Sequence, residues 1–544
     1  MSVAFNFRNL RSLFQIKVRE LILGYQYRFM PFDNENTYIK MVENNEEDLF
    51  HKRFEESLVK VTSLFDKEYP NLVNGEIIEQ EKLLHVSPLD GKTQVGTFQM
   101  STKETSQKAV KIARENYREW YSRGYLARAE LFLRAAEMMS EEKFELSAIL
   151  SYENGKNRYE AMGDVDEAID FMRYYALNLI ENQGYARFTG TAYYGEESKS
   201  VMKPYGVFLV VAPFNFFSIT VGMVSGPLIV GNSVILKPSS DIPLSSFKFV
   251  ELMHRAGVPK GALIYLSGSG GRVGRTLYTD DGVDGIVFTG SREIGTKIYK
   301  EAQEKRPKVA ITEMGGKDTI IVTEKCNMDK AVEGVAKSAF GYSGQKCSAC
   351  SLALIDERIY DTFKKKLVEY SGKLVVDDPR KKGTFTGPVV NKDAYEKFQR
   401  IMDTVPKDKI LLGGKRIPKE GYYVENTILD NVGDPNIERV ELFLPILAIK
   451  PIGSLQKAIE FVNSMEYGLT GGIFTEDVKE IESYFNNVDV GVIYANRRRG
   501  GSTGAMVGSQ PFVGWKMSGT SGKGTGSFYY LQQFLREQAQ TIVR

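Results

Sequence analysis

Three residues in this chain have types and surroundings suited to covalent chemistry on a carbonyl group. Cys347 follows Gly344-Gln345-Lys346, a context that predicts an accessible, electropositive loop favouring the thiolate. Glu313 precedes two glycines, and an unpaired acid facing an apolar pocket would have its pKa raised toward neutrality, as a general base for water requires. Asn215 lies in an uncharged stretch, so its amide must find a hydrogen-bond partner or face a ligand as an oxyanion donor.

Plainer interpretations of the same residues stay open from the sequence alone. Cys347-Ser-Ala-Cys350 also fits a C-x-x-C redox pair or a merely structural pair, and oxidation could join the two thiols reversibly. Glu313 could be a surface acid at the end of a strand. A Cys-His hydrolase is disfavoured because no histidine follows His254.

The middle of the chain alternates strands and helices. The stretch Gly206–Leu236 has no charged side chain and is long enough to span a membrane. Pro213, Asn215, Pro227 and Asn232 interrupt it, which favours two buried strands around a short helix.

A parallel doubly wound sheet is predicted by four short apolar strands: Val207–Val211, Ser233–Leu236, Leu263–Leu266 and Gly285–Phe288. Ligands of such sheets bind at the carboxyl ends of the strands. The loops predicted there are Pro213–Asn215, Lys237–Ser239, Gly268–Gly270 and Thr289–Ser291. The glycines Gly268, Gly270 and Gly274 suit a phosphate or a plain helix-entry turn equally.

Flanking segments complete the predicted architecture. Residues 103–182 have helical spacing of apolar positions, and Asn74-Gly75 predicts a tight hairpin. A second alternating α/β block runs from near Glu313 to Pro451.

Composition excludes several classes of protein. Over 544 residues the net charge is +2, which gives no reason to expect nucleic acid or an anionic membrane as a partner. Three cysteines argue for a reducing compartment, and the three histidines have no metal-ligand spacing, so no metal is predicted. Residues 1–19 are basic and lack acids, which suits either a mitochondrial presequence or a basic surface helix. The predicted location is therefore the cytoplasm in a prokaryote, with the mitochondrial matrix as the alternative.

A set of motifs, in this order, resembles the aldehyde dehydrogenase superfamily from about residue 70 to the end. They are Pro213-Phe-Asn215-Phe, Lys237-Pro-Ser, Phe288-Thr-Gly-Ser291-x-x-x-Gly295, Glu313-x-Gly-Gly, Gly344-Gln-x-Cys347 and Glu441-x-Phe443. Within it, Glu313-Met-Gly-Gly-Lys-Asp318, Thr503-Gly-Ala505 and Gln510-Pro-Phe512 are most similar to the branch that oxidises glutamate γ-semialdehyde, the 1-pyrroline-5-carboxylate dehydrogenases.

The resemblance implies a mechanism. Cys347 would attack the aldehyde, Asn215 and the Cys347 backbone N–H would hold the oxyanion, and Glu313 would activate water to hydrolyse the thioester to glutamate. NAD would accept the hydride. The aldehyde would be bound by Glu153, Phe216, Ser348, Gly504, Ala505 and Phe512.

The resemblance also implies a nucleotide site. The residues carried over to it are Pro213, Phe214, Lys237, Pro238, Ser239, Ser240, Gly268, Gly270, Gly274, Phe288, Thr289, Gly290, Ser291, Gly315, Glu441 and Phe443. Ser240 stands where the superfamily often has a glutamate, and this small neutral residue makes NADP a second candidate cofactor. Leu444, Val513 and a longer Arg497–Ser502 segment are further departures.

The implied architecture is an aldehyde dehydrogenase-like α/β fold assembled as a homo-oligomer. Its expected parts are an N-terminal arm (1–70), an NAD(P)-binding doubly wound domain (71–182 and 204–312), a catalytic α/β domain (313–499), and a small oligomerisation flap with the C-terminal segment (183–203 and 500–544). Competing functions are an aldehyde dehydrogenase for another carboxylated or medium-sized aldehyde, a silent cofactor-binding relative, and a thiol redox protein.

Overall fold

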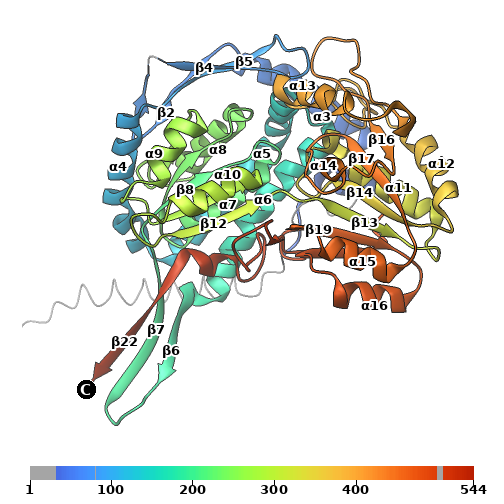
Figure 1. The fold of residues 1–544 in the computed structure, drawn as a ribbon. Coiled ribbons are helices and arrows are strands. Elements are labelled where there is room, and N and C mark those ends of the chain that lie inside the picture. The colour runs from blue at the N-terminus through green and yellow to red at the C-terminus, as the bar shows by residue number, and fades with distance from the viewer. Residues whose placement is uncertain (1–31, 80, 499–505) are drawn as a thin grey trace, which may run out of the picture.

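Two seven-stranded sheets organise the chain in a computed structural model that describes residues 32–79, 81–498 and 506–544 (Figure 1). The predicted α/β class is confirmed. The basic segment 1–19, part of the long Arg497–Ser502 segment and the Gly504-Ala505 pair lie outside the described residues.

The first sheet has five parallel strands and an antiparallel hairpin at one edge. In spatial order its strands are β12 (Val309–Met314), β11 (Gly285–Gly290), β8 (Val207–Val211), β9 (Ser233–Lys237), β10 (Leu263–Tyr265), β2 (Asn71–Leu72) and β3 (Glu76–Ile77). The uncharged stretch thus forms β8, α7 (Phe217–Ile229) and β9, as predicted. Among the described residues, no helix is long and apolar enough to cross a membrane.

This sheet is covered on both faces because alternate residues of each strand point to opposite sides. Val207 and Leu209 of β8 join one apolar core, while Phe208 and Val210 join another. The first core includes residues of α4 (Lys103–Ser122), α9 (Arg275–Tyr278) and α10 (Arg292–Glu301); the second includes α7 and α8 (Pro243–Arg255). The sheet is therefore doubly wound, as predicted.

Two long helices pack beside the second core. They are α5 (Tyr125–Asn154) and α6 (Arg158–Glu181), and α6 also packs against α7. The Asn157 side chain caps α6 by accepting from the backbone N–H groups of Tyr159 and Glu160. Two shorter helices, α2 (Thr37–Glu43) and α3 (Glu47–Val61), lie on this pair.

The second sheet is parallel except for one edge strand. Its order is β15 (Ile410–Leu412), β16 (Thr427–Asp430), β17 (Ile446–Ile452), β14 (Cys350–Asp356), β13 (Asp318–Val322), β19 (Thr470–Phe474) and β20 (Val492–Ala495). One of its faces is covered by α11 (Met328–Phe340) and α12 (Tyr360–Ser371), and the other by α13 (Lys392–Met402), α15 (Leu455–Asn463) and α16 (Val478–Asn487).

Smaller sheets complete the fold. One joins β1 (Glu68–Tyr69), β5 (Gln94–Gln99) and β4 (Lys82–Val86), and a two-stranded sheet joins β18 (Tyr467–Gly468) and β21 (Trp515–Lys516). The flap consists of β6 (Ala186–Gly190), β7 (Glu196–Pro204) and the C-terminal strand β22 (Leu535–Val543), and it projects from the body in Figure 1.

Candidate active site

A cavity of about 450 Å³ brings together Asn215, Glu313 and Cys347. Asn215 follows β8, Glu313 lies near the end of β12, and Cys347 precedes β14 of the second sheet. The predicted loops after β8, β9 and β11 also line this cavity, whereas the Gly268–Gly270 loop does not. Larger grooves of about 1040 and 760 Å³ contain none of the three residues.

The loop that carries Cys347 is held rigidly by buried hydrogen bonds. Tyr342 and Ser343 have positive φ angles of 49° and 53°, a conformation that costs free energy in non-glycine residues. The Tyr342 hydroxyl donates to the Asn154 carbonyl, and the Ser343 hydroxyl donates to the Gly387 carbonyl. Gln345 accepts from the Val390 backbone N–H at 2.8 Å. These contacts fix the backbone from which the Cys347 side chain enters the cavity.

The prediction that Cys347 lies in an electropositive loop is wrong. Lys346 turns away from the cavity and forms an ion pair with Glu160 of α6 at 2.5 Å. Burial, followed by the negative charges of Asp318, Glu441 and Glu313, raises the pKa of the Cys347 thiol well above its ordinary value. Sequence adjacency misled here because neighbouring side chains of a loop can point in opposite directions.

The prediction that the pKa of Glu313 is raised is confirmed. Burial raises the pKa of the Glu313 carboxyl well above its ordinary value, opposed by one hydrogen bond from the Gly514 backbone N–H at 3.0 Å. A carboxyl group held in this way can exchange a proton with a water molecule in the cavity.

The turn that carries Asn215 and Phe216 is anchored through the start of α7. The Asp164 carboxylate accepts from the backbone N–H groups of Phe217 and Ser218, at 3.0 and 2.8 Å. It also pairs with Lys156 at 2.6 Å, and both side chains are almost fully buried. Lys156 Nζ lies 4.2 Å from the centre of the Phe216 ring. Asn215 is only 4% exposed and lines the cavity.

Part of the cavity lining has features of a nucleotide site. The lining residues predicted for that role are Pro213, Phe214, Ser239, Thr289, Gly290, Ser291, Gly315, Glu441 and Phe443. Ser291 caps α10, whose positive end therefore opens on the cavity. The Phe214 and Phe443 rings meet edge to face at 5.7 Å. A Cβ atom on Gly315 would lie 1.8 Å from Glu441 Oε2, so only glycine leaves this carboxylate its place.

Other predicted cofactor residues do not line the cavity. Lys237 is buried at the end of β9 and donates to the Pro238 carbonyl, while Ser240 is exposed beyond it. Phe288 packs in the core of the first sheet. Gly270 and Gly274 bound a π-helical turn rather than opening a long helix, because α9 spans only four residues. Gly268, with φ of 149°, precedes this turn.

A second cavity of about 330 Å³ shares the lining residue Phe216 with the first. Lys346, next to Cys347, also lines it, as do Met506 and Val507 directly after the predicted Gly504-Ala505 pair. Its main acidic wall comes from α6: Glu160, Asp164, Asp166, Glu167 and Asp170.

Sequence reasoning missed Glu167. Burial raises the pKa of its carboxyl well above the ordinary value, and its Oε1 atom has no hydrogen-bond partner among the described residues. The spacing of Glu160, Asp164 and Glu167 places these acids on one face of a helix, which is the signal that could have identified it. In the first cavity, Lys397 and Tyr467 were also missed.

The prediction that Glu153 lies in the aldehyde pocket is wrong. Glu153 is fully buried and accepts from the backbone N–H groups of Leu244 and Ser245 at the start of α8, and it lines neither cavity. Phe512 does line the first cavity. Ser348 is buried, and its hydroxyl has no hydrogen-bond partner within the described part of the chain.

The cysteine pair is not joined. Cys347 and Cys350 are both free, and the Cys350 thiol donates to the Leu352 carbonyl. Cys350 packs in a core of the second sheet, whereas Cys347 packs against the core below α5 and α6. The two thiols therefore lie in different surroundings despite their C-x-x-C spacing.

Several 1-pyrroline-5-carboxylate dehydrogenases are similar in sequence to this chain over nearly their whole length. The chain is 38% identical over 501 residues to a 1-pyrroline-5-carboxylate dehydrogenase of Geobacillus sp. (strain WCH70), covering 90% of this chain and 96% of the relative. It is 36% identical to 1-pyrroline-5-carboxylate dehydrogenase 2 of Bacillus subtilis (strain 168), covering 95% and 98%.

Solved structures show the same fold. A 1-pyrroline-5-carboxylate dehydrogenase from Thermus with bound NAD matches with a TM-score of 0.89 and 35% identity, covering 95% of this chain and 99% of that one. Betaine aldehyde dehydrogenase from Staphylococcus aureus in complex with NAD⁺ matches with a TM-score of 0.83 and 25% identity, covering 90% and 97%. The model of the aldehyde dehydrogenase family matches residues 77–539. The chain therefore belongs to the aldehyde dehydrogenase family.

Proposed function

We propose that this protein oxidises L-glutamate γ-semialdehyde, the open form of 1-pyrroline-5-carboxylate, to L-glutamate with NAD as the oxidant. Cys347 is the nucleophile, Asn215 holds the oxyanion and Glu313 is the base. The observation that carries the choice of substrate is the buried Glu167 carboxyl group, whose Oε1 atom has no hydrogen-bond partner among the described residues, in the cavity beside Phe216 and Lys346.

Carbon–sulfur bond formation begins the reaction. The Cys347 sulfur, after losing its proton, adds to the aldehyde carbon, and the carbonyl oxygen becomes negatively charged. The Asn215 amide and the Cys347 backbone N–H donate to this oxygen. Because Asp164 and Lys156 fix the turn after Asn215, the amide is oriented before the substrate arrives.

The adduct on Cys347 becomes a thioester when its C–H bond breaks, the hydrogen leaves as hydride to the NAD that would be bound, and the oxyanion re-forms the C=O bond. Hydrolysis of this thioester completes the reaction. Glu313 takes a proton from water, the oxygen attacks the acyl carbon, and the carbon–sulfur bond breaks to release the carboxylic acid and the Cys347 sulfur. Burial keeps the Glu313 pKa high enough for the carboxylate to accept this proton.

The substrate's amino acid end fits the second cavity. A buried oxygen without a hydrogen-bond partner is costly, and an ammonium group within hydrogen-bond distance of Glu167 Oε1 would offset that cost. The free hydroxyl of Ser348 suits the substrate carboxylate, and Gly504 and Ala505 are proposed to add backbone N–H donors. A simple alkyl aldehyde would leave these polar groups unpaired.

The first cavity fits NAD, which supplies a hydride acceptor when bound. The start of α10 at Ser291 suits the pyrophosphate. Lys237 is buried two residues before Ser239, which lines the cavity, and its ammonium donates to the Pro238 carbonyl; it is proposed to bond the adenosine ribose. Glu441 occupies the space left by Gly315 and is proposed to hold the nicotinamide ribose. Ser240 is neutral and exposed, so the 2′-phosphate of NADP would meet no acidic side chain at that position. NADP is therefore the second candidate cofactor.

The test is the rate of NADH and NADPH formation with 1-pyrroline-5-carboxylate, succinate semialdehyde and a simple alkyl aldehyde, for wild type and Cys347→Ala. Preference for 1-pyrroline-5-carboxylate that is lost in the variant supports the proposal, and the cofactor ratio decides between NAD and NADP. If the protein oxidises another aldehyde but not 1-pyrroline-5-carboxylate, the proposed substrate is wrong, while the proposed role of Cys347 as nucleophile stands.

The architecture suits a homo-oligomer in which the first sheet binds the nucleotide and the second sheet carries the nucleophile. Most residues of the flap are exposed or half-buried, and Phe188 is 59% exposed. Such a small sheet is stabilised by burial against another subunit.

A further inference from the structure

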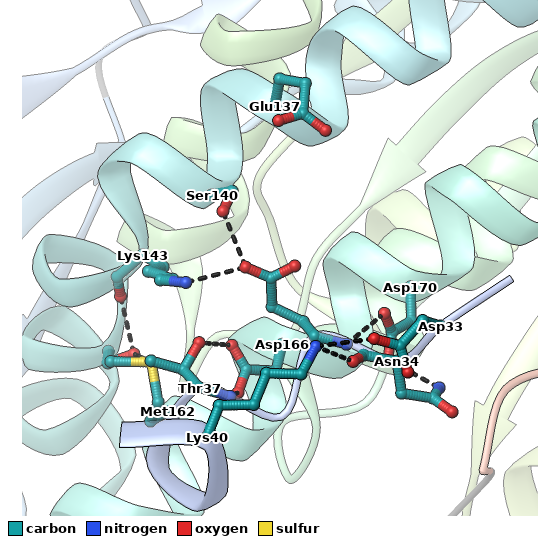
Figure 2. A network of polar contacts seen from close by, with 12 residues as sticks. Asp33, Asn34, Thr37, Lys40, Glu137, Ser140, Lys143, Met162, Asp166 and Asp170 are labelled. Atoms are coloured by element: carbon teal, nitrogen blue, oxygen red, sulfur yellow. Dashed lines mark hydrogen bonds and ion pairs between the residues drawn. The ribbon is translucent and has the colours of Figure 1, made fainter. Parts of the chain in front are cut away.

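A short segment of the N-terminal arm crosses α6 and is bonded to it by carboxylates. We call residues Asp33–Thr37 the strap. Asp166 accepts from both the backbone N–H and the hydroxyl of Thr37, each at 2.7 Å. One turn further along α6, Asp170 accepts from the Glu35 backbone N–H at 3.0 Å. Figure 2 shows these contacts side by side.

A second anchor holds the strap to α5. The Glu35 carboxylate accepts from Ser140 and Lys143 of α5, each at 2.8 Å, and pairs with Arg173 of α6. Burial alone would raise the Glu35 pKa, but the hydrogen bonds from Lys143 and Arg173 lower it to about 2. Glu35 therefore stays ionised at neutral pH and keeps its ion pairs with both helices.

The strap also borders the second cavity. Asn34 and Asn36 line that cavity together with Met506 and Val507. The Asn34 amide uses both of its hydrogens, donating to Asp170 Oδ2 at 2.8 Å and to the Val507 carbonyl at 3.3 Å. One side chain thus joins the arm, α6 and the turn at Met506–Gly508, which is distant in the sequence.

Backbone hydrogen bonds and an aromatic ring also hold this turn. Within it, the Met506 and Gln510 backbones bond to each other, and Gly508 donates to the Gly526 carbonyl. Phe32, at the entrance to the strap, packs against Gly508, where a Cβ atom would lie 3.0 Å from the Phe32 ring. Gly508 has φ of 79° and so favours glycine.

We propose that Asn34 is a positioning residue for the aldehyde: by bridging Asp170 and the Val507 carbonyl, it holds the Met506–Gly508 turn as one wall of the aldehyde pocket. The assignment of the second cavity to the aldehyde rests on the proposed function. The link between Asn34 and the turn does not, and it is tested separately.

The variants are Asn34→Ala, which removes the amide, and Asn34→Asp, which keeps the volume but replaces the donor with a carboxylate beside Asp170. The matched control is Asn44→Ala, at an exposed asparagine of the same arm just after α2. Thermal unfolding of each variant establishes that it is folded. Because the strap keeps its Asp166 and Glu35 anchors, the two Asn34 variants are expected to fold.

Two measurements are made on the full chain. Hydrogen exchange of peptides covering 506–512 is expected to accelerate about tenfold in both Asn34 variants and to stay unchanged in Asn44→Ala. The KM for 1-pyrroline-5-carboxylate is expected to rise about tenfold in the Asn34 variants, with the KM for NAD and the kcat nearly unchanged.

The outcomes separate the two proposals. Unchanged exchange at 506–512 in a folded Asn34→Ala variant overturns the positioning role. Faster exchange without a change in the aldehyde KM places the turn outside the aldehyde pocket and also overturns it. If the wild type oxidises a different aldehyde, the proposed function fails, and the same comparison of KM values is made with that aldehyde.

Discussion

At the residue scale, the resting state of Cys347 gives the most direct prediction. Burial and the nearby acids keep the thiol protonated at neutral pH, so only a small fraction is thiolate. Alkylation of Cys347 by iodoacetamide should therefore accelerate about tenfold per pH unit between pH 7 and 9, because the thiolate is the reactive form. Peptide mass mapping identifies the labelled cysteine. A labelling rate that levels off near pH 7 would mean that an unseen cation stabilises the thiolate.

Glu313 should control the second half of the reaction. Glu313→Gln removes the base for water, so kcat should fall by about 10²- to 10⁴-fold while the first turnover survives. Rapid mixing should then show a burst of about one NADH per Cys347 followed by slow turnover. In the wild type, the carboxylate fraction grows as pH rises toward the raised pKa, so kcat should increase with pH across the neutral range. Loss of the burst in the variant would assign Glu313 to acylation instead.

At the element scale, Glu153 supports α8 rather than the substrate. It accepts from two backbone N–H groups at the first turn of that helix. Glu153→Gln, which keeps the size but only one acceptor oxygen, should lower the free energy of unfolding by about 1 to 2 kcal/mol. The KM for the aldehyde should not change. A raised KM in a variant of normal stability would return Glu153 to the substrate site.

The pH dependence of stability gives a separate check on this carboxyl group. Burial raises the Glu153 pKa to about 8, well above the value of about 4.3 expected when unfolded, so the folded chain binds this proton more tightly. The free energy of unfolding of the wild type should therefore fall as pH rises through the interval between these values. Glu153→Gln should lack this contribution. Urea unfolding at pH 5.5 and pH 8 should therefore show a smaller difference in the free energy of unfolding between the two pH values for the variant than for the wild type.

The elements themselves were largely predictable, since local patterns determine them. Apolar runs bounded by proline and asparagine predicted β8, α7 and β9, and Asn74-Gly75 predicted the hairpin of β2 and β3. The π-helical turn at Gly270–Gly274 was not predictable, because glycine permits many backbone conformations and tertiary packing selects one.

At the scale of the whole molecule, motif order predicted the three residues that meet in the first cavity. Contacts between distant segments could not be predicted in this way. The direction of Lys346 depends on Glu160, 186 positions away, and the position of Asn34 depends on Asp170 and Val507. The sequence shows residue types and local periodicity, whereas side-chain direction is decided by packing between segments that are far apart in the chain.

The flap yields the last prediction, which concerns assembly. β22 pairs with β7 along its whole length, and Phe188, Ile542 and Val543 are all more than half exposed, so apolar surface is left uncovered. We expect a solution mass of at least twice the 61.3 kDa chain by light scattering, and a smaller assembly after deletion of residues 535–544. Phe188→Asp should also weaken assembly, whereas Arg187→Asp, on the opposite face of β6 where its pairing with β7 is regular, should not. Equal effects of the two substitutions would mean that general flap stability, rather than an apolar contact through Phe188, holds the subunits together. A monomeric wild type would show that the flap has another role.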